Sequence, residues 1–107
     1  MTSNETKQEE KITVFVDYKL KDIIPGFMDD WKEEVRFMRE ALEKGDYETI
    51  LKLGHNMKGI GGTCGFDAIT DMGRSLEEAA KVMDPEGIGK TLNKLSSYLK
   101  RVEVVYE

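Results

Sequence analysis

Apolar residues recur at helical spacing along most of this chain. The first such stripe alternates steps of four and three residues: Ile24, Met28, Trp31, Val35, Met38 and Leu42. This spacing is typical of a helix that packs one face against neighbours. Pro25 suits the first turn of that helix, and Gly45-Asp46 is expected to end it and to cap the next.

Three further helices follow from the same reasoning. The second is predicted from about Tyr47 to the glycine cluster near Gly61, the third from Phe66 to about Met83. Asp84-Pro85 signals a fourth start. The stripe of the third is Phe66, Ile69, Met72, Leu76, Ala80 and Met83, and that of the fourth is Ile88, Leu92, Leu95, Leu99 and Val102. Short joints force antiparallel neighbours, so the predicted fold class is all-α, an antiparallel up-down-up-down four-helix bundle.

A short extended or helical segment is expected before the bundle. Residues 1–11 are polar and charged, which predicts a disordered tail, and residues 12–107 are predicted to form the domain. The β-branched and aromatic run Ile12 to Val16 predicts an extended piece laid over one end of the bundle, with no sheet to join. Asp17 and Asp22 offer caps for a short helical turn.

Length and charge narrow the class of protein. The 107 residues fit one domain, and the net charge of −5 argues against nucleic-acid binding, which needs clustered Lys and Arg. Residues 1–11 contain no apolar stretch of the kind that a secretion signal or a membrane span requires. A single cysteine, Cys64, excludes an intrachain disulfide and suggests packing in a reducing compartment. The expectation is a cytoplasmic monomer with protein partners.

The single histidine of the chain is predicted to face solvent. At about 100° per residue, the apolar residues of the second helix cluster in one half of the wheel, and His55 lies roughly 150° from their centre. Gly59 lies one turn further on the same face, where it removes a side chain that would screen the imidazole, and Lys58 can place an ammonium nearby. For Gly54, on the core side, close helix packing is the natural explanation. The remaining glycines of the cluster are expected to end the helix: Gly61, Gly62 and Gly65.

An exposed imidazole beside an ammonium suits phosphoryl transfer. Imidazole titrates near neutrality, and its unprotonated nitrogen attacks an activated phosphoryl group. A nearby lysine then balances the incoming charge, since a phosphorylated group carries close to two negative charges. The chemistry requires no metal or other cofactor in the module itself.

The string His55-Asn56-Met57-Lys58-Gly59, with Gly65-Phe66 and Leu76-Glu77 beyond it, resembles the histidine phosphotransfer (HPt) family. The resemblance extends upstream over Asp17, the run 23–27, Ala41-Leu42 and Gly45-Asp46, and covers roughly residues 17 to 100. It implies that His55 exchanges a phosphoryl group with receiver-domain aspartates of response regulators or hybrid sensor kinases, with Mg²⁺ held by the receiver. It further implies that Lys58 assists electrostatically, that Gly59 gives clearance and that Glu77 orients the imidazole.

Several alternatives stand beside this interpretation. Glu77 is equally well explained as a solvated helix charge. The main rival function is a phosphorylation-inert helical adaptor that docks response regulators without chemistry. A kinase dimerisation helix is disfavoured because Asn56 stands where an acidic residue usually follows the histidine, and the segment 59–65 lacks the ending of a P-loop. Partner specificity is expected in the solvent-facing residues Glu48, Lys52, Asn56 and Gly62.

Overall fold

The four predicted helices are present in the computed structural model, which describes residues 10–107. The elements follow in the order β1 (Ile12–Val16), a short 3₁₀ helix η1 (Tyr18–Leu20), α2 (Ile24–Glu43), α3 (Tyr47–Cys64), α4 (Asp67–Lys81), α5 (Pro85–Arg101) and β2 (Val102–Tyr106). Most of the predicted tail, residues 1–9, lies outside the described residues. Glu10 and Lys11 are exposed and belong to no helix or strand.

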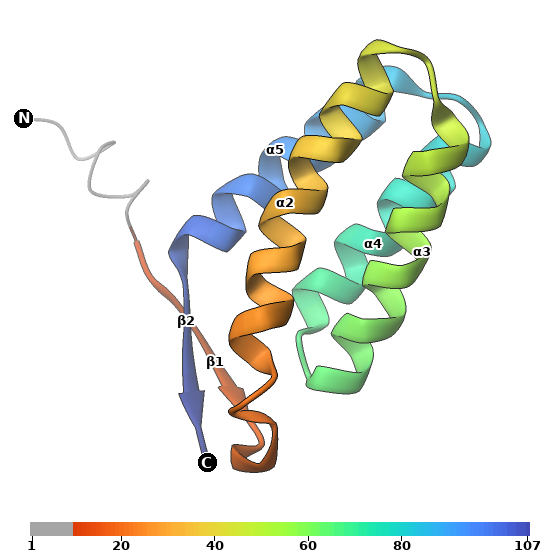
Figure 1. The fold of residues 1–107 in the computed structure, drawn as a ribbon. Coiled ribbons are helices and arrows are strands. Elements are labelled where there is room, and N and C mark those ends of the chain that lie inside the picture. Colours follow the sequence, from red (N-terminus) through yellow and green to blue (C-terminus); the bar gives the residue numbers. More distant parts are fainter. Residues whose placement is uncertain (1–9) are drawn as a thin grey trace, which may run out of the picture.

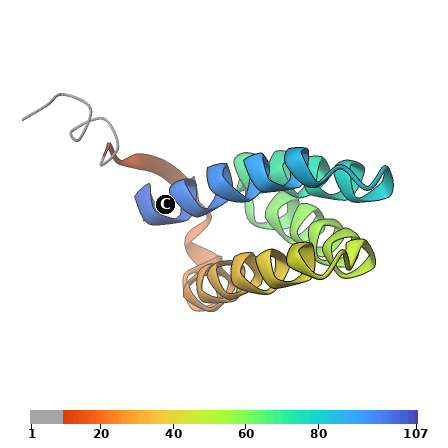
Figure 2. The same cartoon turned by 90° about the horizontal axis from the view of Figure 1, so that it is seen from above.

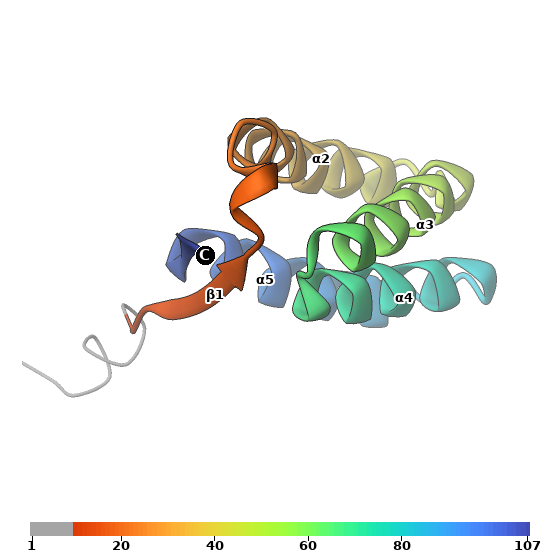
Figure 3. The ribbon, with the colours of Figure 1, turned by 90° about the horizontal axis from the view of Figure 1, so that it is seen from below.

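The helices pack as a bundle in which each contacts two others: α2 with α3 and α5, and α4 with α3 and α5. Consecutive helices run in opposite directions, as the sequence colours show in Figure 1. Seen from above and from below, α3 lies between α2 and α4 (Figures 2 and 3). This order places the outer surfaces of α2, α3 and α4 side by side.

The core is formed mostly by the predicted stripes, but the expectation that the third helix reaches Met83 and buries it is wrong, because α4 ends at Lys81 and Met83 is 65% exposed. Trp31 of α2 is buried in the core, with its ring edge-on to Phe66 at 5.3 Å between centroids and stacked with Phe27 at 6.2 Å. Burying one such apolar side chain stabilises the fold by roughly 1.5–3 kcal/mol. The largest fully buried side chains include Trp31, Phe66, Ile24, Met38, Ile50, Met57, Ile69, Leu76, Ile88, Leu92 and Leu95. Cys64 is buried with a free thiol, as expected for a packing residue.

Several helix ends follow the predicted signals. Asp46 and Asp84 cap α3 and α5 by accepting bonds from the backbone N–H groups of Thr49 and Gly87. Gly65, at φ +87°, terminates α3 in the left-handed conformation that glycine adopts without steric cost.

The expectation that Gly61 and Gly62 end the helix is wrong, because α3 continues to Cys64. A Cβ on Gly61 would lie 2.8 Å from Cγ2 of Ile69, so this glycine permits close packing of α3 on α4 inside the helix. Gly62 is exposed on the same helix.

The last turn predicted for the fourth helix is a strand instead. The helix ends at Arg101, and Val102 has an extended backbone at φ −72° and ψ 137°. Strand β2 pairs in parallel with β1, in a register from Ile12 opposite Val102 to Val16 opposite Tyr106. The extended segment therefore does have a strand to join, and β1 and β2 lie side by side (Figure 1). Residues 102–106 favour a strand because they are mostly β-branched or aromatic.

Among residues 10–107, no helix is long and apolar enough to cross a membrane.

Candidate functional site

His55 lies on the outer surface of α3, and its side chain is 62% exposed. The opposite face of the helix is buried, with Ile50 and Met57 fully inside the core. This anchoring holds the histidine outward, and the prediction that it faces solvent is confirmed. An imidazole in this position is accessible to a macromolecular partner.

Glu77 of α4 reaches the imidazole from the neighbouring helix. Its Oε2 lies 3.0 Å from Nδ1 of His55, and its Oε1 accepts a hydrogen bond of 2.8 Å from Nζ of Lys58. The glutamate side chain is only 11% exposed, so its interpretation as a solvated helix charge is wrong. The three side chains form one network between α3 and α4.

The network determines which ring nitrogen of His55 is free. An ionised carboxylate only accepts hydrogen bonds, so its contact with Nδ1 requires the proton to be on Nδ1. In the neutral ring Nε2 then keeps its lone pair. The arrangement therefore supplies a nucleophilic nitrogen on an oriented, exposed ring.

The charge of Glu77 is maintained by its partners. The hydrogen bond from Lys58 is the largest cause that lowers the pKa of Glu77 below its ordinary value of 4.5, and His55 adds to it, while partial burial opposes the change. Glu77 is therefore a carboxylate at neutral pH. Lys58, expected to place its ammonium beside the imidazole, contacts the carboxylate that also contacts the imidazole.

Close approach of α3 and α4 makes this network possible. A Cβ on Gly54 would lie 3.0 Å from the carbonyl oxygen of Gly73 and 3.1 Å from the backbone nitrogen of Glu77. A Cβ on Gly73 would lie 2.6 Å from the backbone nitrogen of Lys58. The packing explanation for Gly54 is thus confirmed. Gly73 was not singled out from the sequence, although a glycine inside a helix costs about 1 kcal/mol relative to alanine and so signals a need.

Gly59 differs from these two glycines. A Cβ placed there would meet nothing within 4 Å. No packing contact within the described chain explains its presence in the helix interior. Because Gly59 lies one helical turn from His55, no side chain projects from the helix surface at this position beside the imidazole.

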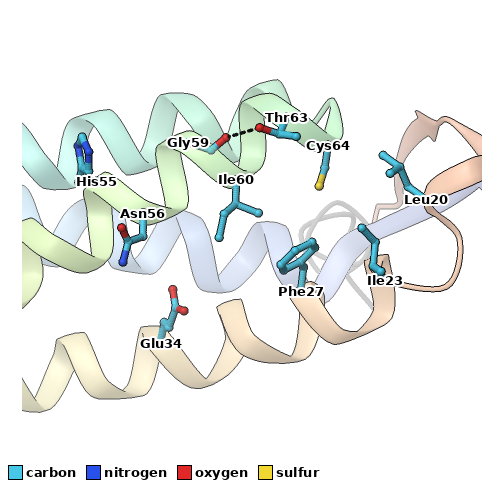
Figure 4. Close-up of a pocket in the computed structure, with 10 residues that line it drawn as sticks. All are labelled: Leu20, Ile23, Phe27, Glu34, His55, Asn56, Gly59, Ile60, Thr63 and Cys64. Atoms are coloured by element: carbon cyan, nitrogen blue, oxygen red, sulfur yellow. Dashed lines mark hydrogen bonds between the residues drawn. The ribbon is translucent and has the colours of Figure 1, made fainter.

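A groove of about 580 Å³ adjoins the histidine between α2 and α3. Asn56 and Ile60 point from α3 toward α2, Glu34 and Phe27 point from α2 toward α3, and His55 points away from α2 at the groove's edge (Figure 4). The remaining lining residues are Leu20, Ile23, Gly59, Thr63 and Cys64. The α2 side of this groove was missed in the sequence. The groove could have been predicted from Ile23 and Phe27, two apolar residues that do not belong to the core stripe of this helix.

The residues expected to determine partner specificity are all exposed: Glu48, Lys52, Asn56 and Gly62. Asn56 lines the groove, whereas Lys52 pairs with Glu48 along the helix at 3.6 Å. Of the four, Asn56 is thus the one that the groove brings together with His55.

No group of three or more His, Cys, Asp or Glu side chains within residues 10–107 is arranged to hold a metal ion. The site offers a nucleophile, a carboxylate and an ammonium, together with an open surface. This is a set suited to accepting a group carried by another protein.

Comparison with known proteins agrees with this geometry. A family model described as Hpt domain matches residues 22–103. Neither the curated proteins nor the solved structures contain a match to the chain.

Proposed function

The chain belongs to the Hpt domain family, the histidine phosphotransfer modules of two-component signalling, and we propose that it relays phosphoryl groups between receiver-domain aspartates through phospho-His55. Nε2 of His55 attacks the phosphorus of a receiver's aspartyl phosphate. A nitrogen–phosphorus bond forms as the acyl phosphate P–O bond breaks and the aspartate leaves as a carboxylate. The reverse step loads the next receiver, so the protein is a carrier and not a kinase.

The observation that carries this proposal is the contact of Glu77 with Nδ1 of His55 at 3.0 Å. It supports a role for Glu77 in orienting the ring and presenting Nε2 to solvent. Glu77 also stabilises the positive charge that the ring carries once Nε2 is bonded to phosphorus. Lys58 keeps that carboxylate ionised and adds an ammonium near the incoming phosphoryl oxygens.

Receiver domains and hybrid sensor kinases are the proposed partners. The groove between α2 and α3 supports docking beside the histidine, because its apolar lining is open to solvent next to His55. Gly59 provides the clearance that a receiver needs to bring its aspartyl phosphate to the ring. Mg²⁺ belongs to the receiver's own site in this scheme. We further propose that residues 12–107 act as one monomeric, cytoplasmic carrier domain.

The alternative is a phosphorylation-inert adaptor that docks response regulators. An adaptor needs the groove but has no use for the contacts of Glu77 with Nδ1 and with Lys58. The buried carboxylate therefore favours the carrier.

Phosphoryl transfer from a phosphorylated receiver domain separates the two. Wild type is expected to acquire acid-labile, base-stable label, and His55→Gln none. The matched control is Glu78→Gln, an exposed position on α4 outside the groove, which retains the histidine and its contacts. A receiver that binds the protein but labels neither form, or labels both equally, would establish the adaptor.

A further inference from the structure

One carboxylate interrupts the apolar α2 wall of the groove. Glu34 is half-buried and points from α2 toward α3, opposite Asn56 (Figure 4). Within residues 10–107 it has no hydrogen-bond or ion-pair partner among the side chains. Asp30 lies one helical turn before it and adds a second negative charge to the same face.

Some acidic side chains of the bundle are paired with a cation, and others, such as Glu40 and Glu78, are unpaired within residues 10–107 but exposed to water. Glu33 pairs with Arg36 on the outer face of α2, and Glu77 pairs with Lys58. Glu34, in contrast, is partly buried and lies near the negative charge of Asp30. Burial is the larger cause and the charge of Asp30 the smaller one that raise the pKa of Glu34 above its ordinary value of 4.5. Half-burying a carboxylate without a counter-charge is unfavourable. A cation brought by a binding partner would offset this cost.

We propose that Glu34, supported by Asp30, is a specificity determinant that binds a lysine or arginine side chain of the docking receiver domain. The inference rests on the proposed function and names one feature of the partner surface. Ile23, Phe27 and Ile60 accept apolar side chains of the partner, and the carboxylate beside them selects receivers that carry a basic residue within that apolar surface. A receiver with an acidic residue there meets repulsion in a partly desolvated groove.

A purely structural role for Glu34 predicts different behaviour. Glu34 and Asn56 face each other across the groove, so the carboxylate is also placed to stabilise the packing of α2 on α3. In that case its loss changes the unfolding midpoint but leaves the response to the receiver and to salt unaltered. The two roles therefore separate in one set of measurements.

The test uses Glu34→Gln, with Glu40→Gln as the matched control on the exposed face of the same helix. The probe is a receiver domain that accepts phosphoryl groups from the wild-type carrier, found by screening receiver domains from the source organism. Phosphoramidate, a small phosphoryl donor that needs no docking, loads His55 in each variant. The rate of transfer to the receiver is then measured against receiver concentration at low salt and at about 1 M salt, where exposed charges are screened.

Glu34→Gln is expected to raise the half-saturating receiver concentration about fivefold at low salt. The maximal rate and the loading by phosphoramidate stay as in wild type, and the difference shrinks in high salt. Glu40→Gln matches wild type throughout. An unchanged half-saturating concentration for Glu34→Gln, or a lowered unfolding midpoint with no change in that concentration, would overturn the inference and leave the proposed function intact. If wild type is loaded by phosphoramidate but exchanges with no receiver, the proposed function fails and this inference fails with it.

Discussion

One buried carboxylate contacts two side chains of the site, one with each of its oxygens. Glu77 gives one oxygen to Nδ1 of His55 and the other to Nζ of Lys58. The lysine keeps the carboxylate charged, and the carboxylate keeps the ring in the form whose outer nitrogen is free. Lys58 and His55 are thus linked through Glu77.

Glu77→Gln tests this division of roles. The amide is neutral and also carries donor hydrogens, so it no longer fixes the proton on Nδ1 or stabilises the charged phosphorylated ring. The rate of His55 phosphorylation is expected to fall on the order of tenfold. Losses of this size are typical when the carboxylate that hydrogen-bonds the second ring nitrogen of a metal-binding histidine is removed. The measurement is labelling by phosphoramidate, which reports on the imidazole without a docking step.

The matched control for that variant is Glu78→Gln, the next residue on α4, which is exposed. It removes the same charge from the same helix without touching His55. Equal rates for wild type and Glu77→Gln would mean that the imidazole needs no orienting carboxylate.

At the scale of elements, the site is a consequence of how closely α3 and α4 approach. Gly54 and Gly73 bring the two backbones together, and this places Glu77 beneath His55. Sequence patterns predicted the helices well, because each stripe of apolar residues is bounded by local signals such as Asp46 and Gly65. Burial of Glu77 escaped prediction, since it depends on the distance between two helices and not on either one alone.

Substitutions at Gly59 and Gly73 distinguish a glycine that leaves room for a partner from one that allows two helices to pack closely. Gly59→Ala is expected to stabilise the fold by about 0.5–1 kcal/mol, because alanine favours the helix and its methyl group meets nothing. Gly73→Ala is expected to destabilise it by about 1–3 kcal/mol, because the methyl group would lie 2.6 Å from a backbone nitrogen of α3. Urea unfolding of the two variants and wild type measures both changes.

Gly59→Ala should also slow transfer from a phosphorylated receiver while leaving labelling by phosphoramidate unchanged. A more stable variant with unaltered receiver transfer would argue against clearance as the function of this glycine.

On the scale of the whole molecule, the strands near the two ends of the described chain pair with each other. The helical pattern of apolar residues did not predict this pairing. The parallel pair of β1 and β2 joins residues more than 80 positions apart, as in Val14 opposite Val104. Local patterns identified the first strand as extended. They assigned Val102 to a helix, because its spacing continued the stripe of α5, and pairing between distant segments leaves no local signal.

The strand pair is predicted to contribute to the stability of the bundle through its inner face. Val16 is 2% exposed in the core, whereas Val105 on the outer face is 41% exposed. Val16→Ala is expected to cost about 1–3 kcal/mol of unfolding free energy, and Val105→Thr, which keeps a β-branched side chain, less than about 0.5 kcal/mol. Equal unfolding midpoints for the two variants would mean that the pair is not part of the cooperative fold.

We propose that His55 carries the phosphoryl group on Nε2 because Glu77 occupies Nδ1. The most direct test is NMR of the protein after transfer from a phosphorylated receiver domain, in which couplings between phosphorus and the ring protons identify the bonded nitrogen. We expect one phosphohistidine signal with phosphorus on Nε2 in wild type and none in His55→Gln. Phosphorus on Nδ1, or no phosphohistidine in wild type despite receiver binding, would contradict it.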